Sequence, residues 1–110
     1  MGLALFKEKR LSQRRRLTGL LPGRLVYGKS RLDVFCKPVD LSVNGLGIVL
    51  AKEIEAGTNM VLLLQNREVS LQVAWGQPDF GKQDMYRYGL VTLDPADNLE
   101  EIFLASGCLK

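Results

Sequence analysis

Residues 40–50 constrain the fold most, because within eleven positions they change from a strand pattern to turn chemistry and back to an apolar run. The turn part contains Asp40, Ser42, Asn44 and Gly45. Short polar side chains bond to nearby backbone, and glycine adopts conformations closed to other residues. The stretch therefore predicts two strands joined by a tight turn, for which Asn44-Gly45 is a suitable two-residue loop.

The same stretch carries a candidate polar surface. Asp40 and Ser42 are two positions apart, so on an extended chain their side chains point to the same side. A carboxylate and a hydroxyl beside Gly45, which lets a ligand approach the backbone, form a small binding surface. A turn that satisfies its own hydrogen bonds explains the same residue types, and the residues taken alone favour that explanation.

Short apolar or alternating runs separated by turn signals recur along the chain and predict an all-β domain. The clearest run is residues 69–75, where apolar residues alternate with Ser70, Gln72 and Ala74. Tight connections between short strands favour an antiparallel barrel. Six strands are predicted, over residues 20–27, 32–41, 45–51, 60–64, 69–75 and 85–93, with the longest loop at residues 76–84.

A short helix is predicted after the last strand. Asp94 is a suitable N-cap, and Pro95 suits the first turn. Gly107 is a suitable C-terminal stop. The apolar face of the helix is expected to consist of Leu99, Ile102, Phe103 and Leu104.

Length and composition restrict the function classes. A chain of 110 residues is expected to be one domain. It has no histidine and no recognisable nucleophile–base arrangement, so we expect neither an enzyme nor a cofactor. Cys36 and Cys108 lack metal-ligand spacing and predict free thiols rather than a metal site.

No window approaches the roughly 18 apolar residues of a membrane span, and residues 1–6 are too short for a signal peptide, which favours a cytoplasmic location.

Charge is distributed unevenly along the chain. Residues 1–31 hold nine Lys or Arg and one Glu, whereas residues 32–110 hold six Lys or Arg and eleven Asp or Glu. Six of the ten residues 7–16 are basic. Because arginine suits bidentate contacts with phosphate and guanine, the basic arm is expected to bind an anionic partner: a nucleotide, a nucleic acid or a membrane surface.

The arm and the turn motif together resemble the PilZ domain, a bacterial receptor module for the second messenger cyclic di-GMP. The family signature is RxxxR before the first strand, followed by DxSxxG at the end of the second. Asp40, Ser42 and Gly45 match the second part. Arg10 and Arg14 have the spacing of the first part, and this is the register that we favour.

A second arginine register is open. The triplet of residues 14–16 resembles the doubled or tripled arginine of the family, and the second motif position then falls on Thr18 or Gly19. That alignment would remove one guanidinium from the site. In either register Arg15 or Arg16 is expected near the ligand.

The resemblance spans roughly residues 10–104 and implies a six-stranded antiparallel PilZ-type β-barrel, with a short C-terminal helix across one opening and a flexible basic N-terminal arm. The expected divisions are the arm, 1–19, the barrel, 20–94, and the helix with its tail, 95–110. The implied function is a cyclic di-GMP receptor whose arm changes conformation and signals to an effector protein in motility, surface or exopolysaccharide control. The implied ligand-binding residues are Arg10, Arg14, Arg15, Arg16, Asp40, Ser42 and Gly45.

Two other functions stay open at this level. Some PilZ proteins lack a working motif and act as protein adaptors without binding the nucleotide. Small β-barrels with basic arms also bind single-stranded nucleic acid on aromatic platforms, but no basic face is evident outside the arm, so no nucleic-acid partner is expected. Trp75 is predicted to pack in the core or at a strand end, and a ligand-platform role is the less favoured alternative.

Overall fold

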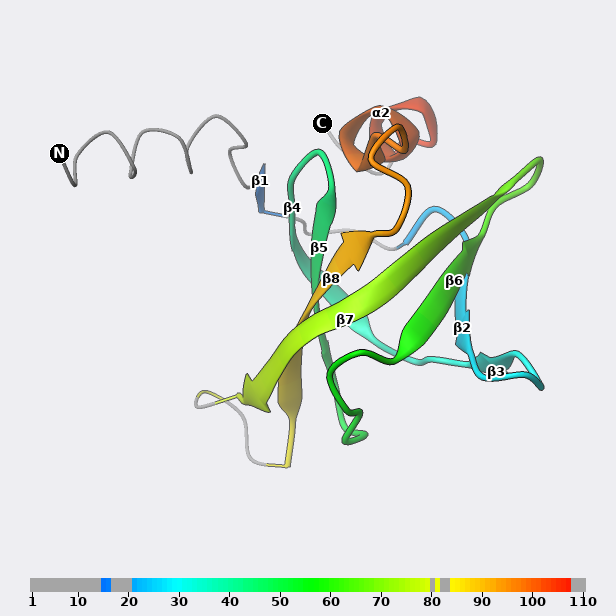
Figure 1. Cartoon of the computed structure of the whole chain (residues 1–110). Coiled ribbons are helices and arrows are strands. Elements are labelled where there is room, and N and C mark those ends of the chain that lie inside the picture. The colour runs from blue at the N-terminus through cyan, green and yellow to red at the C-terminus, as the bar shows by residue number, and fades with distance from the viewer. Residues whose placement is uncertain (1–14, 17–20, 80, 82–83, 108–110) are drawn as a thin grey trace, which may run out of the picture.

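A computed structural model describes residues 15–16, 21–79, 81 and 84–107, with the side chains of residues 15–16 left out. These residues form one antiparallel sheet and a short helix (Figure 1). Within the described ranges, the strand order is β1-β4-β5-β8-β7-β6-β2-β3. The elements are β1 (Arg15–Arg16), β2 (Arg24–Tyr27), β3 (Leu32–Asp33), β4 (Lys37–Leu41), β5 (Gly45–Leu50), β6 (Asn59–Leu63), β7 (Glu68–Pro78), β8 (Tyr86–Thr92) and α2 (Leu99–Ala105).

The sheet curls because β3 and β4 are two halves of one bent segment. β3 pairs with β2, and β4 pairs with β5, so the chain between them links the two sides of the sheet. Val34 sits at the bend, where its N–H donates to the Leu25 carbonyl at 2.8 Å. The single predicted strand 32–41 is therefore wrong as a continuous element. When β3 and β4 are counted as one strand, the structure contains the six predicted strands. In addition, β1 pairs with the outer edge of β4.

The other strands follow the predicted pattern with shifted ends. The strands β5, β6 and β8 lie within one residue of their predicted bounds. The first barrel strand begins at Arg24, after the kink at Pro22, rather than at residue 20. β7 continues to Pro78, three residues beyond its predicted end, so the expected loop over residues 76–84 is shorter than predicted.

The interior of the curled sheet is the hydrophobic core. β5 lies between β4 and β8 and is buried along its whole length, as its apolar sequence predicts. Tyr88 extends the core at one end, where its hydroxyl accepts from the N–H of Ile54 at 2.6 Å and donates to the carbonyl of Lys52 at 3.0 Å. The inward residues of this region are Leu41, Leu46, Ile48, Leu71, Val73, Tyr88 and Leu90.

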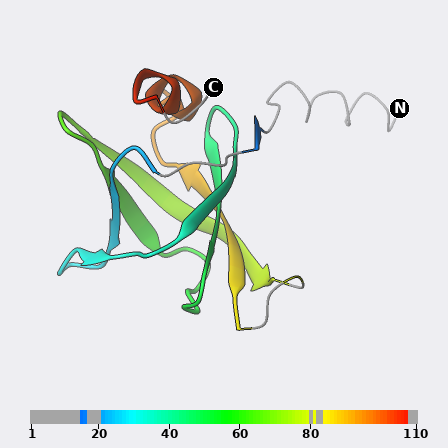
Figure 2. The ribbon, with the colours of Figure 1, turned by 180° about the vertical axis from the view of Figure 1, so that it is seen from behind.

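The helix α2 lies beyond the end of the sheet that carries the β4–β5 turn (Figure 2). Its N-cap is Asn98, whose side chain accepts from the N–H of Glu101 at 3.1 Å, and not Asp94 as predicted. Asp94 instead accepts from the N–H of Ala96 at 2.9 Å, so this aspartate forms a local turn before the helix. Gly107 ends the helix at a φ of 76°, as predicted.

The apolar face of α2 is narrower than predicted. Leu99 and Phe103 are fully buried and Ile102 packs against the core. Leu104, predicted on the same face, is 61% exposed. A residue that follows Phe103 directly is turned by about 100° around the helix, which directs it away from the barrel.

Two further expectations concern the cysteines and the absence of a membrane-spanning segment. Cys36 is a free, half-buried cysteine, and burial raises the pKa of its thiol to about 11, so it is protonated at neutral pH. Cys108 lies outside the described residues. The one helix of the described part, α2, is too short to be a membrane-spanning segment.

Candidate functional site

Four residues from four adjacent strands form a row on the outer face of the sheet. Asp40 of β4 is opposite Gly47 of β5, Gly47 is opposite Gly89 of β8, and Gly89 is opposite Trp75 of β7. Residues directly opposite one another in antiparallel strands project on the same face. The residues that flank Gly47 and Gly89 along the chain belong to the core, so the row faces outward, and Trp75 at its end is itself 41% exposed.

The two glycines bring the end residues of this row toward its centre. A Cβ on Gly47 would lie 2.4 Å from Oδ1 of Asp40, and a Cβ on Gly89 would lie 2.2 Å from Nε1 of Trp75. The carboxylate therefore lies against the backbone of β5 and the indole against the backbone of β8. Since neighbouring strands are about 4.8 Å apart, an anionic acceptor and an aromatic face meet on adjacent strands.

Asp40 is fixed by a charged partner on a third strand. Nη2 of Arg87 donates to Oδ2 of Asp40 at 3.2 Å. The Asp40 side chain is 17% exposed and that of Arg87 is 38% exposed. The carboxylate is thus oriented and half-buried, yet still reachable by a ligand that carries hydrogen-bond donors.

The β4–β5 turn that follows Asp40 is anchored to the segment before α2. The N–H of Ser42 donates to the Gly45 carbonyl at 2.9 Å, so the two loop residues are Val43 and Asn44 rather than Asn44-Gly45. Nδ2 of Asn44 donates to Oγ1 of Thr92 and to the carbonyl of Asp97, each at 2.9 Å. The N–H of Leu99 donates to the Val43 carbonyl at 2.7 Å. Asn44 therefore ties the turn to the start of the helix.

The predicted site residues fall into three groups. Asp40, Ser42 and Gly45 are brought together at one end of the β4–β5 hairpin, where Ser42 and Gly45 are buried. The backbone of β1 pairs with β4, placing Arg15 opposite Leu41 and Arg16 opposite Asp40. These two arginines were predicted in the flexible arm, whereas their backbone adds a strand to the sheet. Arg10 and Arg14 lie outside the described residues.

A family model for the PilZ domain matches residues 8–105, nearly the whole chain. The chain belongs to the PilZ family. Searches of curated proteins and of solved structures gave no match. PilZ domains are ligand-binding receptor domains of a family that binds cyclic di-GMP, and they are not enzymes. In the described part of this PilZ domain, no group of three or more His, Cys, Asp or Glu residues could hold a metal ion.

Four residues of the candidate site were not among the ligand-binding residues predicted from the sequence. Trp75 was expected to pack in the core or at a strand end, with a ligand platform as the less favoured alternative, and it is 41% exposed on the outer face. Arg87, Gly47 and Gly89 were not singled out at all. Isolated glycines inside apolar strands signal a close approach of another group to the backbone, and this signal was present at both positions.

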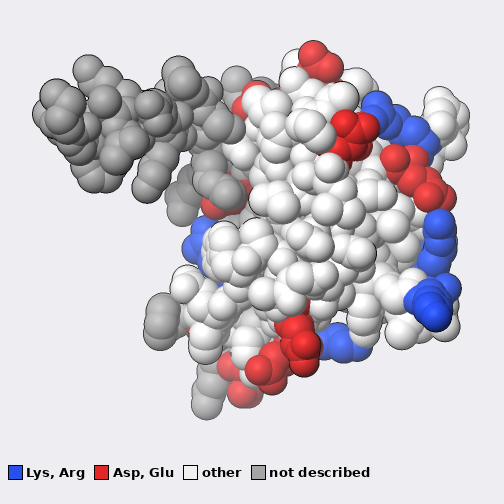
Figure 3. All heavy atoms as spheres, in the orientation of Figure 1, with Lys and Arg blue, Asp and Glu red and all other residues white. Residues whose placement is uncertain are grey.

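Basic side chains of the barrel are interleaved with acidic ones. On the face seen in Figure 3, most Lys and Arg lie along the side of β2 and β3. There Arg24 pairs with Asp33 at 2.9 Å and Arg31 pairs with Glu68 at 2.8 Å. This mixed surface gives no support to a nucleic-acid interface on that side of the PilZ domain.

Proposed function

We propose that this PilZ protein is a cytoplasmic receptor for cyclic di-GMP. The observation that carries the proposal is the order of residues across the outer face. The signature carboxylate of Asp40 has strand β1 of the arginine arm on one side. On the other side lies the exposed indole of Trp75, which comes from β7, three strands away, and lies against β8. Acceptor, aromatic face and basic segment thus converge on one surface.

The chemistry of guanine matches these groups. The N1–H and N2–H groups of guanine donate hydrogen bonds to the carboxylate of Asp40. Its O6 and N7 atoms accept two hydrogen bonds from one arginine guanidinium. The π face of Trp75 supports stacking of a base, worth about 1–3 kcal/mol. The arginines also pair with the two phosphates of the ligand.

The buried members of the signature have a supporting part in this proposal. Ser42 is 7% exposed and Gly45 lies in the hairpin opposite Val91. Gly45 leaves room for the ring, and Ser42 serves the phosphate or the base from the end of the strand. Both fix the hairpin that orients Asp40.

The arm transmits the signal in our proposal. Like charges in residues 7–16 repel one another until an anionic ligand neutralises them and supplies shared acceptors. Pairing of β1 with β4 holds the backbone of Arg15 and Arg16 at the edge of the sheet, beside Asp40. The rearranged arm then presents a surface to an effector protein that controls motility, the cell surface or exopolysaccharide.

Titration of the purified 110-residue chain with cyclic di-GMP tests the receptor function. Calorimetry should show saturable binding, and the fluorescence of Trp75, the single tryptophan, should change with the same midpoint. GTP is the control nucleotide. Absence of both heat and spectral change up to about 100 µM ligand, equivalent to roughly −5.5 kcal/mol, would contradict the proposal and favour a protein adaptor that binds no nucleotide.

A second experiment distinguishes the two arginine registers. Arg10→Ala and Arg14→Ala should each weaken binding by about 1.5–3 kcal/mol, the scale of a charge-assisted hydrogen bond. Lys7→Ala, which removes an arm charge outside the motif, is the matched control. If Arg10→Ala binds like the parent while Arg15→Ala loses binding, the motif begins in the triplet of residues 14–16.

A further inference from the structure

Arg87 is a cationic residue of the candidate site that comes from the barrel and not from the arm. It lies on β8, opposite Val49 of β5 and Gln77 of β7. Gly89 follows two positions later on the same strand, so the two residues share the outer face. The guanidinium reaches Asp40 on β4, and the side chain therefore crosses the intervening strand β5.

The ion pair places three hydrogen-bonding atoms side by side. The carboxylate of Asp40 has two acceptor oxygens, and Nη2 of Arg87 lies 3.2 Å from one of them, Oδ2. Each carboxylate oxygen has two lone pairs, so Oδ2 can accept from Arg87 and from a ligand together. A guanidinium has five N–H donors, and the bond to Asp40 uses one of them. The pair thus presents an acceptor, a second acceptor and a donor in sequence.

The Watson–Crick edge of guanine is the complement of this sequence. It presents two neighbouring donors, the N2 amino group and N1–H, followed by the acceptor O6. Adenine carries an amino donor in the position of O6 and has no N2 amino group. An edge formed by a carboxylate and an adjoining guanidinium therefore matches guanine and opposes adenine.

Exposure and the neighbouring indole fit the same use of the pair. The side chain of Arg87 is 38% exposed, so a ligand can reach its guanidinium from the outer face. The indole of Trp75 lies against Gly89, and the carboxylate of Asp40 lies against Gly47 on the next strand. A base that stacks on the indole can thus direct its edge across β5 toward the ion pair.

We propose that Arg87 is a specificity-determining residue, which donates to O6 of guanine while Asp40 accepts from N1–H and N2–H. This inference rests on the receptor function proposed above and adds a contact from outside the family signature. O6 has two lone pairs, so an arm arginine that forks onto O6 and N7 shares this acceptor with Arg87. Arg87 therefore fixes which base the barrel accepts, and the arm adds affinity.

A cycle over one side chain and one ligand atom tests the contact. The ligands are cyclic di-GMP and its analogue with sulfur, a poor acceptor, in place of O6. The proteins are the parent and Arg87→Met, which keeps a long side chain without a donor. With cyclic di-GMP, calorimetry should show about 10-fold weaker binding by Arg87→Met. The sulfur substitution should weaken binding by the parent about fivefold more than binding by Arg87→Met, because only the parent loses the contact to O6.

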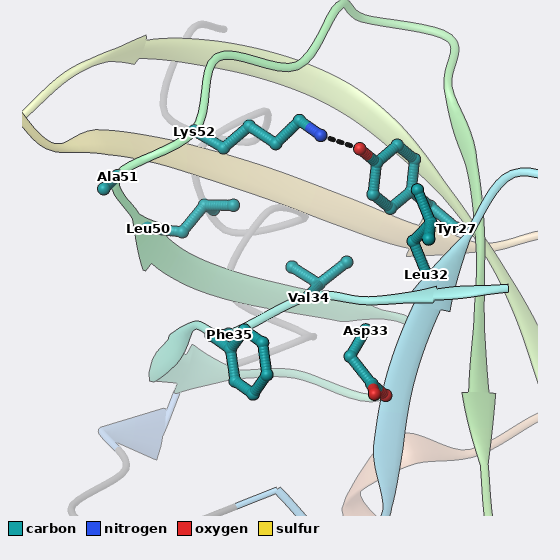
Figure 4. Close-up of a pocket in the computed structure, with 8 residues that line it drawn as sticks. All are labelled: Tyr27, Leu32, Asp33, Val34, Phe35, Leu50, Ala51 and Lys52. Carbon is teal, nitrogen blue, oxygen red and sulfur yellow. Dashed lines mark hydrogen bonds between the residues drawn. The ribbon is translucent and has the colours of Figure 1, made fainter.

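Arg24→Met is the matched control, since Arg24 also pairs with an aspartate, Asp33, at 2.9 Å. Figure 4 shows Asp33 at the β3–β4 bend, beside a largely apolar pocket, and β3 is the last strand in the sheet order. This variant should bind both ligands like the parent. Equal effects of sulfur on the parent and on Arg87→Met would overturn the contact to O6 and leave the receptor function standing. A parent that binds neither ligand would instead contradict the receptor function itself.

Discussion

Replacing Asp40 with alanine should weaken binding of cyclic di-GMP by about 10- to 150-fold, equivalent to roughly 1.5–3 kcal/mol for a hydrogen bond to a charged group. The carboxylate is the acceptor beside the indole of Trp75, and its half-buried position makes water a poor substitute. Loss of the ion pair with Arg87 should cost the fold less than about 1 kcal/mol, because the arginine is substantially exposed.

Calorimetric titration and urea unfolding of the same Asp40→Ala preparation separate the two effects. Asp40→Asn retains one acceptor oxygen at the same place and should bind with intermediate affinity. Glu55→Ala removes an exposed carboxylate from the β5–β6 connection and is the matched control. An Asp40→Ala affinity within about twofold of the parent would show that the carboxylate does not contact the ligand, and would move the proposed site elsewhere.

The part of the site that the sequence predicts is the part encoded locally. The order Asp40, Ser42, Gly45 is visible in six consecutive residues, and the strand pattern places it at the end of a hairpin. Hairpin turns and alternating strands are determined by neighbours along the chain, so the sequence indicates them directly.

Trp75 shows why the rest of the site was missed. The alternation of Val69, Leu71 and Val73 continues to Trp75 in the sequence and predicts an inward side chain. In the structure the ladder between β7 and β8 shifts register between Val73 and Trp75, which turns the indole outward. The bulge depends on pairing with a strand more than ten residues away, so no local pattern reveals it.

The start of α2 was misplaced for a related reason. Asp94 and Pro95 fit the first turn of a helix when they are considered alone. In the folded chain, Asn44 donates to the carbonyls of Pro95 at 3.3 Å and of Asp97 at 2.9 Å. These bonds come from a distant hairpin and fix the segment as a turn, so the helix begins after Asn98.

The largest effect on stability is expected from truncating Phe103, the residue that α2 directs into the barrel. Phe103 is fully buried between the helix and the barrel, whereas Leu104, the next residue, is 61% exposed. Phe103→Ala should lower the free energy of unfolding by about 3–5 kcal/mol, since it removes buried apolar surface and leaves a cavity. That is a large share of the roughly 5–15 kcal/mol that stabilises a typical domain.

Leu104→Ala is the matched control, because it truncates an apolar side chain in the same turn of the same helix. Its effect should stay within about 0.5 kcal/mol, the usual range for an exposed position. Urea unfolding followed by far-ultraviolet circular dichroism measures both variants under identical conditions. Equal losses at the two positions would mean that the helix presents residues 103 and 104 to the barrel together, as the sequence pattern alone predicts. A loss confined to Phe103 would instead confirm the rotation of α2 that exposes Leu104 and leaves that side chain free of the core.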